Sequence, residues 1–517
     1  MHDPTVQRLR ASLARMAATA LALLLITVLV PGASRSLLRA QGPDTVKVQD
    51  LFEPPRLVSD IHPGSSSSDP DHLTAANGKL FFEADDALGC CELWQSDGTL
   101  TGTLKIREQI TGAIATAPDE MIAWKGMVYF DGHTDAYGTD LWKTDGTSAG
   151  TAMVKDINPG ELMSMLSWLT VAGDTLYFQA WDEAAGYQLW KSDGTPAGTA
   201  MVKHINPGDP FLGAQVQYLT AVGETLFFQA DDGTFGNELW KSDGTAAGTM
   251  LVKDITPGPQ STFPYDAHAP DEFIAFDGAL YFRAGGSLWK SDGTSEGTTA
   301  VKEVYPIQLF VAGDTLYFWG WDDAQSAGGL FKSDGAAAGT VLIKALNPFG
   351  ESELETFAAS NGLLYFPADD GTHGLELWKS DGTAAGTTLI ADLYSGSDCG
   401  YSGADPCASN PRSLTPFGAG VVFAADDGLH GSELWFSDGT EAGTVLIQDL
   451  NPLMTCVWGT DPGQGSDPCD SFMGQSWIAQ ANGALYFRAD DGTHGEELWA
   501  LELGINSRIY LPFVSKP

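Results

Sequence analysis

The chain has 517 residues, with 67 acidic against 27 basic residues and a formal net charge of −40. An acidic chain without a basic stripe argues against nucleic acid and anionic membranes as partners. Its 60 glycines, 10% aromatic residues and 43% hydrophobic residues are typical of a globular, β-rich protein.

The chain opens with the pattern of an export signal. Basic residues precede an apolar run over 16–30, and small residues follow it. The run is short for a membrane span, although a retained anchor is the alternative. We expect a secreted, extracellular or cell-surface protein with no membrane insertion after signal removal. The predicted organisation is a signal peptide over 1–41, a linker over 42–54, a repeat domain over 55–503 and a C-terminal tail over 504–517.

A phrase of the form Glu-Leu-Trp-x-Ser-Asp-Gly-Thr-x-x-Gly-Thr, with variants, recurs nine times at intervals of 42 to 64 residues. A period in this range indicates one supersecondary unit repeated along the chain. We interpret its aromatic residue as core that packs between units, with carbohydrate stacking as the alternative. The nine positions are Trp94, Trp142, Trp190, Trp240, Trp289, Phe331, Trp378, Trp435 and Trp499.

One copy, between residues 167 and 208, shows what a unit folds into. Runs rich in β-branched and aromatic residues lie at 168–172, 175–180, 187–191 and 200–205, with Gly, Asp, Asn and Pro between them. This alternation predicts four sequential antiparallel strands. Four short strands repeated at this period are typical of a β-propeller blade, so the predicted fold class is all-β.

The two ends of the repeat domain predict ring closure. Residues 56–64 match a fourth strand and its exit, and the last copy stops soon after Trp499 without one. The N-terminal strand can therefore complete the C-terminal blade and leave no open sheet edge within the ring. We predict nine blades. A stack that does not close and two smaller rings are the alternatives.

The recurrent phrase resembles the signature of the ELW-x-x-DGT repeat family of exported bacterial proteins. It stands as Glu-Leu-Trp-Lys-Ser-Asp-Gly-Thr at 238–245 and again at 376–383, and the resemblance covers about residues 50–500. It implies export and a repeated β architecture, and it implies no established enzymatic activity.

Six cysteines suit an oxidising compartment. Cys399 and Cys407 lie in one stretch between repeats, and Cys456 and Cys469 lie in the next. Local pairs are the simplest of the fifteen connectivities. Cys90 and Cys91 are adjacent, which leaves a vicinal disulfide or two thiols.

Acidic loops between the second and third strands suggest Ca²⁺ as a cofactor. They read Asp-Asp-Gly-x-x-Gly-x-Glu and offer hard oxygen ligands beside flexible glycines, although Asp and Gly are also ordinary turn residues. Three of these loops carry a histidine, which we interpret as solvated, and the Ser-Asp-Gly-Thr turns favour Asx-turn chemistry. The candidate calcium ligands are Asp231, Asp232, Glu238, Asp369, Asp370, Glu376, Asp426, Asp427, Glu433, Asp490, Asp491 and Glu497.

No nucleophile elbow, phosphate loop or zinc spacing stands out, and no catalytic residue is predicted. The leading expectation is an exported, non-enzymatic propeller that binds an extracellular protein or glycan as an adhesion or surface scaffold. The alternative is a secreted polysaccharide hydrolase or lyase with carboxylates at the channel mouth. A quinoprotein dehydrogenase is a third option.

Overall fold

The computed structural model describes residues 51–106, 120–134, 137–257, 269–323, 327–347, 357–396, 407–452 and 478–504. The predicted signal peptide and almost all of the predicted C-terminal tail lie outside these ranges. Within them, no helix is long and apolar enough to cross a membrane.

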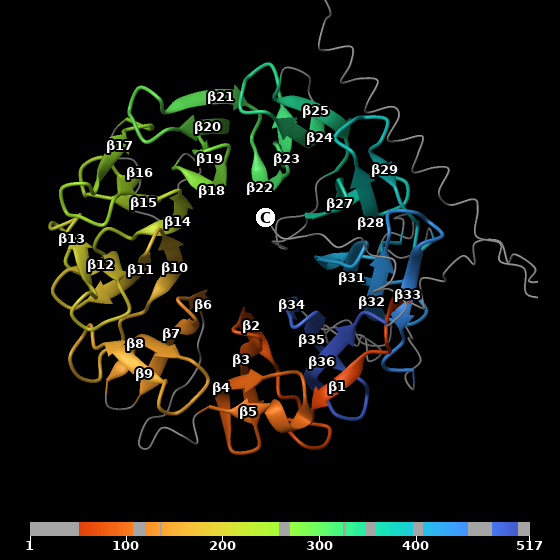
Figure 1. Cartoon of the computed structure of the whole chain (residues 1–517). Helices are drawn as coiled ribbons and strands as arrows, with labels where there is room; N and C mark the ends of the chain where they lie inside the picture. Colours follow the sequence, from red (N-terminus) through yellow and green to blue (C-terminus); the bar gives the residue numbers. More distant parts are fainter. Residues whose placement is uncertain are drawn as a thin grey trace, which may run out of the picture. The chain divides into compact units, whose positions relative to one another are not determined.

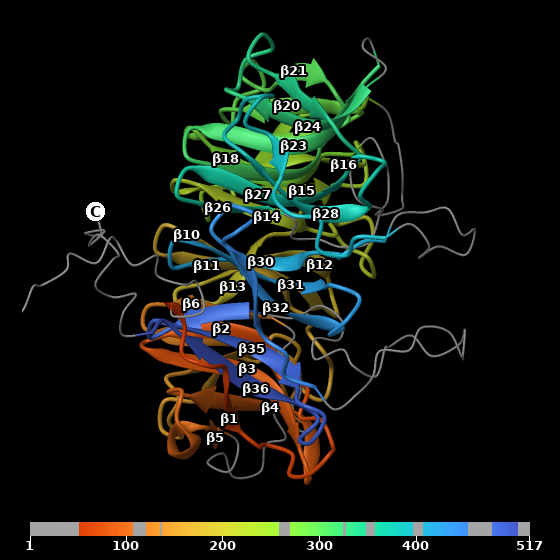
Figure 2. The same ribbon diagram turned by 90° about the vertical axis from the view of Figure 1, so that its right-hand side faces the viewer.

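The described residues form nine four-stranded antiparallel sheets arranged as the blades of a ring (Figure 1). The predicted nine-bladed, all-β propeller is therefore confirmed. Blades 1 to 8 are β2–β5, β6–β9, β10–β13, β14–β17, β18–β21, β22–β25, β26–β29 and β30–β33, and blade 9 is β34–β36 with β1. Figure 2 shows the same ring from a second direction.

The first strand of each blade lies toward the centre of the ring and the second lies beside it (Figure 1). The inner strands are β2 (Asp71–Ala76), β6 (Met121–Trp124), β10 (Ser167–Ala172), β14 (Gln217–Val222), β18 (Asp271–Phe276), β22 (Ile307–Ala312), β26 (Ala358–Ser360), β30 (Arg412–Phe417) and β34 (Ile478–Ala481). The second strands are β3 (Lys79–Asp86), β7 (Met127–Thr134), β11 (Thr175–Asp182), β15 (Thr225–Asp231), β19 (Ala279–Ala284), β23 (Thr315–Asp322), β27 (Leu363–Asp369), β31 (Gly420–Asp426) and β35 (Ala484–Asp490).

The third strands carry the recurrent aromatic residue, and the fourth strands form the outer edge. The third strands are β4 (Gly89–Ser96), β8 (Gly138–Thr144), β12 (Gly186–Ser192), β16 (Asn237–Ser242), β20 (Ser287–Ser291), β24 (Ala327–Ser333), β28 (Leu375–Ser380), β32 (Ser432–Ser437) and β36 (Glu496–Glu502). The fourth strands are β5 (Leu104–Lys105), β9 (Ala152–Lys155), β13 (Ala200–Lys203), β17 (Met250–Lys253), β21 (Thr299–Glu303), β25 (Val341–Ala345), β29 (Thr388–Leu389), β33 (Thr444–Gln448) and β1 (Arg56–Ser59). A short 3-10 turn, η2 (Leu100–Gly102), precedes β5.

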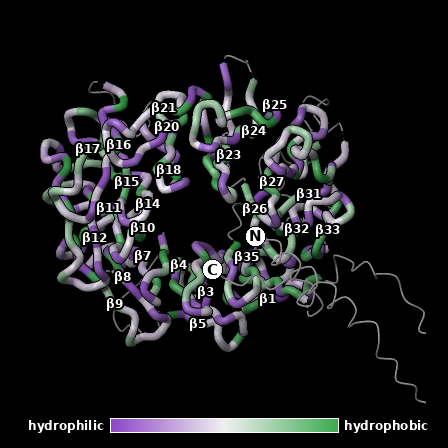
Figure 3. Tube along the Cα trace, turned by 45° about the horizontal axis from the view of Figure 1, so that its top comes forward, coloured by the Kyte–Doolittle hydropathy of each residue, from purple (hydrophilic) through white to green (hydrophobic). Residues whose placement is uncertain are grey.

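Both faces of each blade are apolar. Successive side chains of a strand point to opposite faces, and consecutive apolar residues in these strands therefore cover both. In blade 4, Leu226, Phe228 and Trp240 pack against blade 3, whereas Phe227 and Leu239 pack against blade 5. The same division recurs around the ring, so the core consists of nine clusters, one at each junction between neighbouring blades. Figure 3 accordingly shows hydrophobic stretches in every part of the ring.

The ring closes as predicted, by pairing of the two ends of the domain. β1 lies antiparallel to β36, with Leu57 opposite Trp499. Val58 and Ile61 then join the cluster between blades 9 and 1. At the same junction, the Nδ2 of Asn482 in blade 9 donates to the carbonyl of Gly78 in blade 1 at 2.5 Å. Strand pairing therefore completes blade 9, and apolar packing and a turn-to-turn hydrogen bond join it to blade 1.

Candidate functional site

The Ser-Asp-Gly-Thr turns between the third and fourth strands are closed by their own hydrogen bonds. In blade 4 the Oδ1 of Asp243 accepts from the N–H of Thr245 at 2.8 Å and from its hydroxyl at 2.7 Å. The Oγ of Ser242 accepts from Gly244 N and lies 2.7 Å from the Oγ1 of Thr249. The hydrogen bonds from Thr245 lower the pKa of Asp243. These contacts are Asx-turn chemistry, as the sequence indicated.

The same turns join neighbouring blades. The Nζ of Lys191 in blade 3 donates to the carbonyl of Gly244 in blade 4 at 2.6 Å. Gly244 has a φ of +83°, and a Cβ on it would lie 2.5 Å from the Oη of Tyr177 in blade 3. The corresponding glycine carbonyl of the next blade likewise accepts from Lys143, Lys241, Lys290, Lys332 and Lys379. The repeated phrase therefore builds the joints of the ring.

The opposite face carries the linkers between blades, which are held by the acidic residue of the phrase. In blade 7 the carboxylate of Glu376 accepts from the N–H groups of Leu393 and Ser409, at 3.1 and 3.0 Å, and from the hydroxyl of Ser409 at 2.6 Å. In blade 9 the carboxylate of Glu497 accepts from Ile61 N and His62 N, at 2.9 and 3.0 Å. We call such a residue the linker anchor of its blade.

Charge is not required of a linker anchor. In blade 3 the position is Gln188, whose Oε1 accepts from Ile205 N at 2.9 Å. In blade 2 it is Asp140, which accepts from Ile157 N at 3.0 Å and from the hydroxyl of Ser164 at 2.7 Å. A neutral amide and a carboxylate therefore perform the same task at equivalent positions.

Burial changes the protonation of the anionic anchors. It raises the pKa of Glu376, Glu497 and Asp140 to about 7, because the charged form loses solvation. It also raises the pKa of Glu238, which accepts from the N–H groups of Ile255 and Thr256. The hydrogen bonds to these carboxylates oppose the effect of burial without cancelling it.

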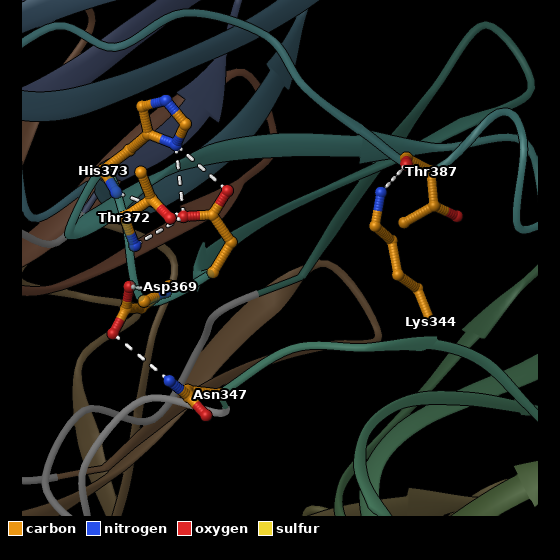
Figure 4. A network of polar contacts seen from close by, with 8 residues as sticks. Lys344, Asn347, Asp369, Thr372, His373 and Thr387 are labelled. Carbon is orange, nitrogen blue, oxygen red and sulfur yellow. Dashed lines mark hydrogen bonds and ion pairs between the residues drawn. The ribbon is translucent and has the colours of Figure 1, made fainter.

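The acidic loops of the calcium hypothesis use their carboxylates as turn caps. Figure 4 shows the loop of blade 7 with Asp369, Thr372 and His373. Asp370 accepts from His373 N and lies 3.0 Å from the Nδ1 of the His373 ring. The Oδ1 of Asp369 accepts from Gly371 N at 2.7 Å, and the Oδ1 of Asp370 accepts from Thr372 N at 2.9 Å. Glu376, the third candidate ligand of this loop, is the buried linker anchor.

The other three loops repeat this arrangement. Each first aspartate accepts from the glycine N–H two residues on, and each second aspartate accepts from the N–H groups two and three residues on. The first aspartates are Asp231, Asp426 and Asp490, and the second are Asp232, Asp427 and Asp491. His430 and His494 lie 2.8 Å from Asp427 and Asp491. Across the described ranges, no three His, Cys, Asp or Glu side chains are grouped so as to hold a metal ion. Calcium binding stays a prediction without a preformed cluster to support it.

The other sequence candidates have mixed outcomes. Seven of the nine recurrent aromatic residues are buried at the junctions between blades, and Trp94 and Trp289 are partly buried there. Cys407 is buried, but Cys399, Cys456 and Cys469 lie outside the described residues. The N–H of Cys91 donates to Asp85 at 2.6 Å, whereas the Cys90 side chain is not among those described. All three cysteine pairings therefore remain predictions.

The feature that sequence reasoning missed lies at the second position of the inner strands. In six blades this residue has a positive φ, between 52° and 62°, within a shift of strand register. Side chains other than glycine rarely adopt this conformation, and such strain is found mainly at functional positions. We call this set, with its equivalent in blade 2, the inner rim. It comprises His72, Glu120, Trp168, Tyr218, Glu272, Gln308 and Ser413.

Aromatic rings run along one arc, from the inner rim at Trp168 and Tyr218 to Phe273, which follows the rim residue Glu272 and packs against the core. The ring centroids of Trp168 and Tyr218 are 5.1 Å apart, and those of Tyr218 and Phe273 are 5.9 Å apart. These rings come from three consecutive blades. Trp168 is 36% exposed, so the row begins at the surface. A row of this kind offers π faces for stacking or for attraction of cations.

A carboxylate stands at each end of this arc. Glu120 accepts from the N–H groups of Trp168 and Leu169, both at 2.9 Å, and thereby holds the strained turn of blade 3. Glu272 accepts from Gln308 N at 3.0 Å, and burial raises its pKa. The nearby Arg283 is paired with Asp271 at 2.7 Å through its Nε.

A comparison of the repeats could have revealed the inner rim. The residue after the rim position is Leu, Met or Phe in all seven blades, whereas the rim position itself holds six different residue types. When one position varies among the repeats and the next is always apolar, the variable position is not constrained by core packing. Its backbone conformation, however, gave no sequence signal, because neither Trp168 nor Glu272 is a residue type that favours a positive φ.

No family model and no curated protein matches this chain. Among solved structures, the chain is similar to a prolyl endopeptidase at 14% identity and a TM-score of 0.36, over 82% of this chain and 60% of that one. It is similar to a puromycin hydrolase at 13% and 0.35, over 86% and 62%. It is also similar to a quinohemoprotein alcohol dehydrogenase of Pseudomonas putida HK5 at 11% and 0.39, over 92% and 79%.

These comparisons contradict the expected function. We expected a non-enzymatic adhesion or surface propeller, with a polysaccharide hydrolase or lyase as the alternative, but the similar propellers include those of several peptidases. This chain spans about 60% of the length of the prolyl endopeptidase. Identities this low show the fold alone, and TM-scores below 0.5 transfer no activity.

Proposed function

We propose that this propeller is a peptide-recognition module that receives cationic peptides at its inner rim. The observation that carries the proposal is the aromatic row from Trp168 through Tyr218 to Phe273, with Glu120 and Glu272 at its ends. This proposal replaces the adhesion scaffold and the polysaccharide enzyme. Export, which residues 1–41 suggest, belongs to the same proposal and places the ligand outside the cytoplasm.

The charge of the site selects a cation. Glu120 and Glu272 stand at the two ends of the aromatic row, and a cation between them gains from the ring quadrupole as well as from the carboxylates. The chain as a whole carries 40 more acidic than basic charges, which attracts cationic ligands and repels anionic ones. Arg283 is paired with Asp271 and also acts to lower the pKa of Glu272, so it offsets part of the negative charge at that end of the arc.

The length of the row favours a peptide over a single ammonium group. Three rings from three blades follow one another at 5.1 and 5.9 Å, which is longer than one ammonium group covers. A peptide supplies cationic side chains and apolar side chains in series, and it can satisfy both kinds of surface along the arc.

The test is calorimetric titration of the full chain with short peptides of equal length that contain either lysine or glutamate. We expect binding of the lysine peptide only, and weaker binding as the salt concentration rises, because exposed charges are screened. Trp168→Ala should lower the affinity about tenfold, equivalent to ~1.4 kcal/mol. Trp321→Ala is the matched control, because Trp321 is also exposed, at 46%, but belongs to blade 6.

Equal binding of both peptides, or an equal loss of affinity in the Trp168 and Trp321 variants, would refute the proposal. Circular dichroism of each variant separates a lost site from a lost fold.

A further inference from the structure

We propose that two linkers beside the inner rim form an apolar docking surface, so that the preferred ligand is a cationic peptide that also carries large apolar side chains. The inference rests on the proposed function for the cationic part of the ligand. The surface, which we call the linker patch, comprises Leu162, Met163, Met165, Phe211 and Leu212.

The first loop of the linker patch is fixed by a buried serine. The N–H of Ser164 donates to Thr139 O at 2.8 Å, and its hydroxyl donates to the linker anchor Asp140 at 2.7 Å. Its carbonyl accepts from Trp181 N at 2.7 Å. The neighbouring Met163 and Met165 nevertheless remain 48% and 51% exposed. The backbone is therefore held while large apolar side chains are turned outward.

The second loop is fixed by an aspartate cap. Asp209 accepts through its Oδ1 from Phe211 N and Leu212 N, at 3.0 and 2.9 Å, and through its carbonyl from Gly213 N at 2.9 Å. Phe211 is 71% exposed. A phenylalanine on a capped turn cannot collapse onto the core, so its apolar surface stays available.

The two loops are joined through the hairpin of blade 3. The Oη of Tyr187 donates to the Sδ of Met165 at 2.9 Å, and the Nε1 of Trp181 donates to Phe211 O at 3.1 Å. Gly213 forms a bridge with Tyr187. The patch is therefore continuous. It also adjoins the inner rim, because Met165 precedes Trp168 by three residues.

Equivalent linkers carry side chains of different chemistry at the position of Met165. Ser68 and Ser409 occupy the place of Ser164 and likewise bond to their linker anchors, at 2.7 and 2.6 Å. The next residue has a φ between 42° and 48° in five linkers, and it is Asp69, Met165, Gln215, Tyr305 or Asn410. Asp and Asn tolerate this conformation, whereas Met does so at a cost. Met165 is the one aliphatic side chain among these five residues, and it is 51% exposed.

Charge complementarity identifies the occupant as a cationic peptide. Glu161, Asp182, Glu183 and Asp209 lie in or beside the two loops, and neither 158–166 nor 206–217 contains a lysine or arginine. An apolar patch with an acidic border fits a peptide with apolar side chains on the patch and cationic side chains toward the border and the arc.

The test compares three peptides of equal length by calorimetry on the full chain: lysine with leucine, lysine with serine, and glutamate with leucine. We expect the lysine–leucine peptide to bind about tenfold more tightly than the lysine–serine peptide, because burying a leucine contributes of order 1.4 kcal/mol or more. The double variant Met165→Asn with Phe211→Ser should remove this preference. Leu88→Ser is the matched control, since Leu88 is 88% exposed on blade 1.

The outcomes separate the two proposals. If Trp168→Ala weakens both lysine peptides while the wild type shows no preference for leucine, the linker patch is refuted and the peptide-binding rim stands. If the leucine preference persists in the double variant, the patch is equally refuted. If the glutamate–leucine peptide binds as well, the cationic occupant is wrong. Sedimentation that shows a dimer of the wild type and a monomer of the double variant would assign the patch to a second copy instead.

Discussion

The turn face and the linker face of the ring are built from the same repeat but differ in how much the copies vary. On the turn face six blades repeat one arrangement, in which Asp243 or its equivalent closes a turn that receives the lysine of the preceding blade. On the linker face the anchor varies among Glu, Asp and Gln, and the loops above it range from serine-rich to apolar. The uniform residues of the turn face build the ring, and ligand specificity is to be sought on the linker face, where the copies differ.

The largest effect is expected on the turn face. Gly244→Ala forces a Cβ to within 2.5 Å of the Oη of Tyr177 at a φ of +83°, whereas Gly278→Ala has a similar φ of +71° and meets nothing within 4 Å. Both substitutions therefore strain the backbone, but only Gly244→Ala also creates a steric clash. We expect Gly244→Ala to be more destabilising than Gly278→Ala by about 1–3 kcal/mol, as measured by denaturant unfolding. Equal losses would show that the joint between blades contributes little.

A smaller effect, dependent on pH, is expected on the linker face. Glu376, Glu497 and Asp140 have pKa values near 7 in the folded state and ordinary values when unfolded, so the folded state binds more protons between about pH 4.5 and 7. Stability is then greatest below this window and falls as the pH rises through 7. The turn-face aspartates, whose pKa is lowered, act only at more acidic pH.

Glu376→Gln isolates one linker anchor, because Gln188 already shows that an amide can occupy the position. We expect the variant to match the wild type at pH 5 and to have a Tm higher by about 1–2 °C at pH 8, measured by calorimetry. A lower Tm at both pH values would mean that the hydrogen bonds accepted by the second carboxylate oxygen, which an amide nitrogen cannot accept, outweigh the penalty for charge burial.

The smallest effect is expected from calcium. The aspartates of all four acidic loops already accept backbone N–H groups, and their glutamates lie among the linker anchors. A preformed site would raise the Tm by an amount set by the calcium concentration over its dissociation constant. We expect the same Tm in millimolar Ca²⁺ and in EDTA. A clear rise would restore the calcium hypothesis and show that the loops rearrange around the ion.

The fold could be predicted from the sequence because each of its determinants is local and repeated. The turn residues, the alternation around Leu239 and Trp240 and the spare strand at residues 56–59 each leave a pattern in the chain. The candidate site could not be predicted, because it depends on which residues become neighbours across blades. Trp168 and Tyr218 lie 50 residues apart, and their positive φ values contradict the preferences of their residue types.

Closure through β1 sets the order in which this molecule can be completed. Residues 56–59 are the first strand of the domain to leave the ribosome, yet their partner is β36, at residues 496–502. Domains begin to fold from the N-terminal side during synthesis, and contacts between distant residues form late. The first strand to be synthesised therefore stays without its β36 partner until the last strand has been made. Once β1 and β36 pair, the ring has no open end from which unfolding can start.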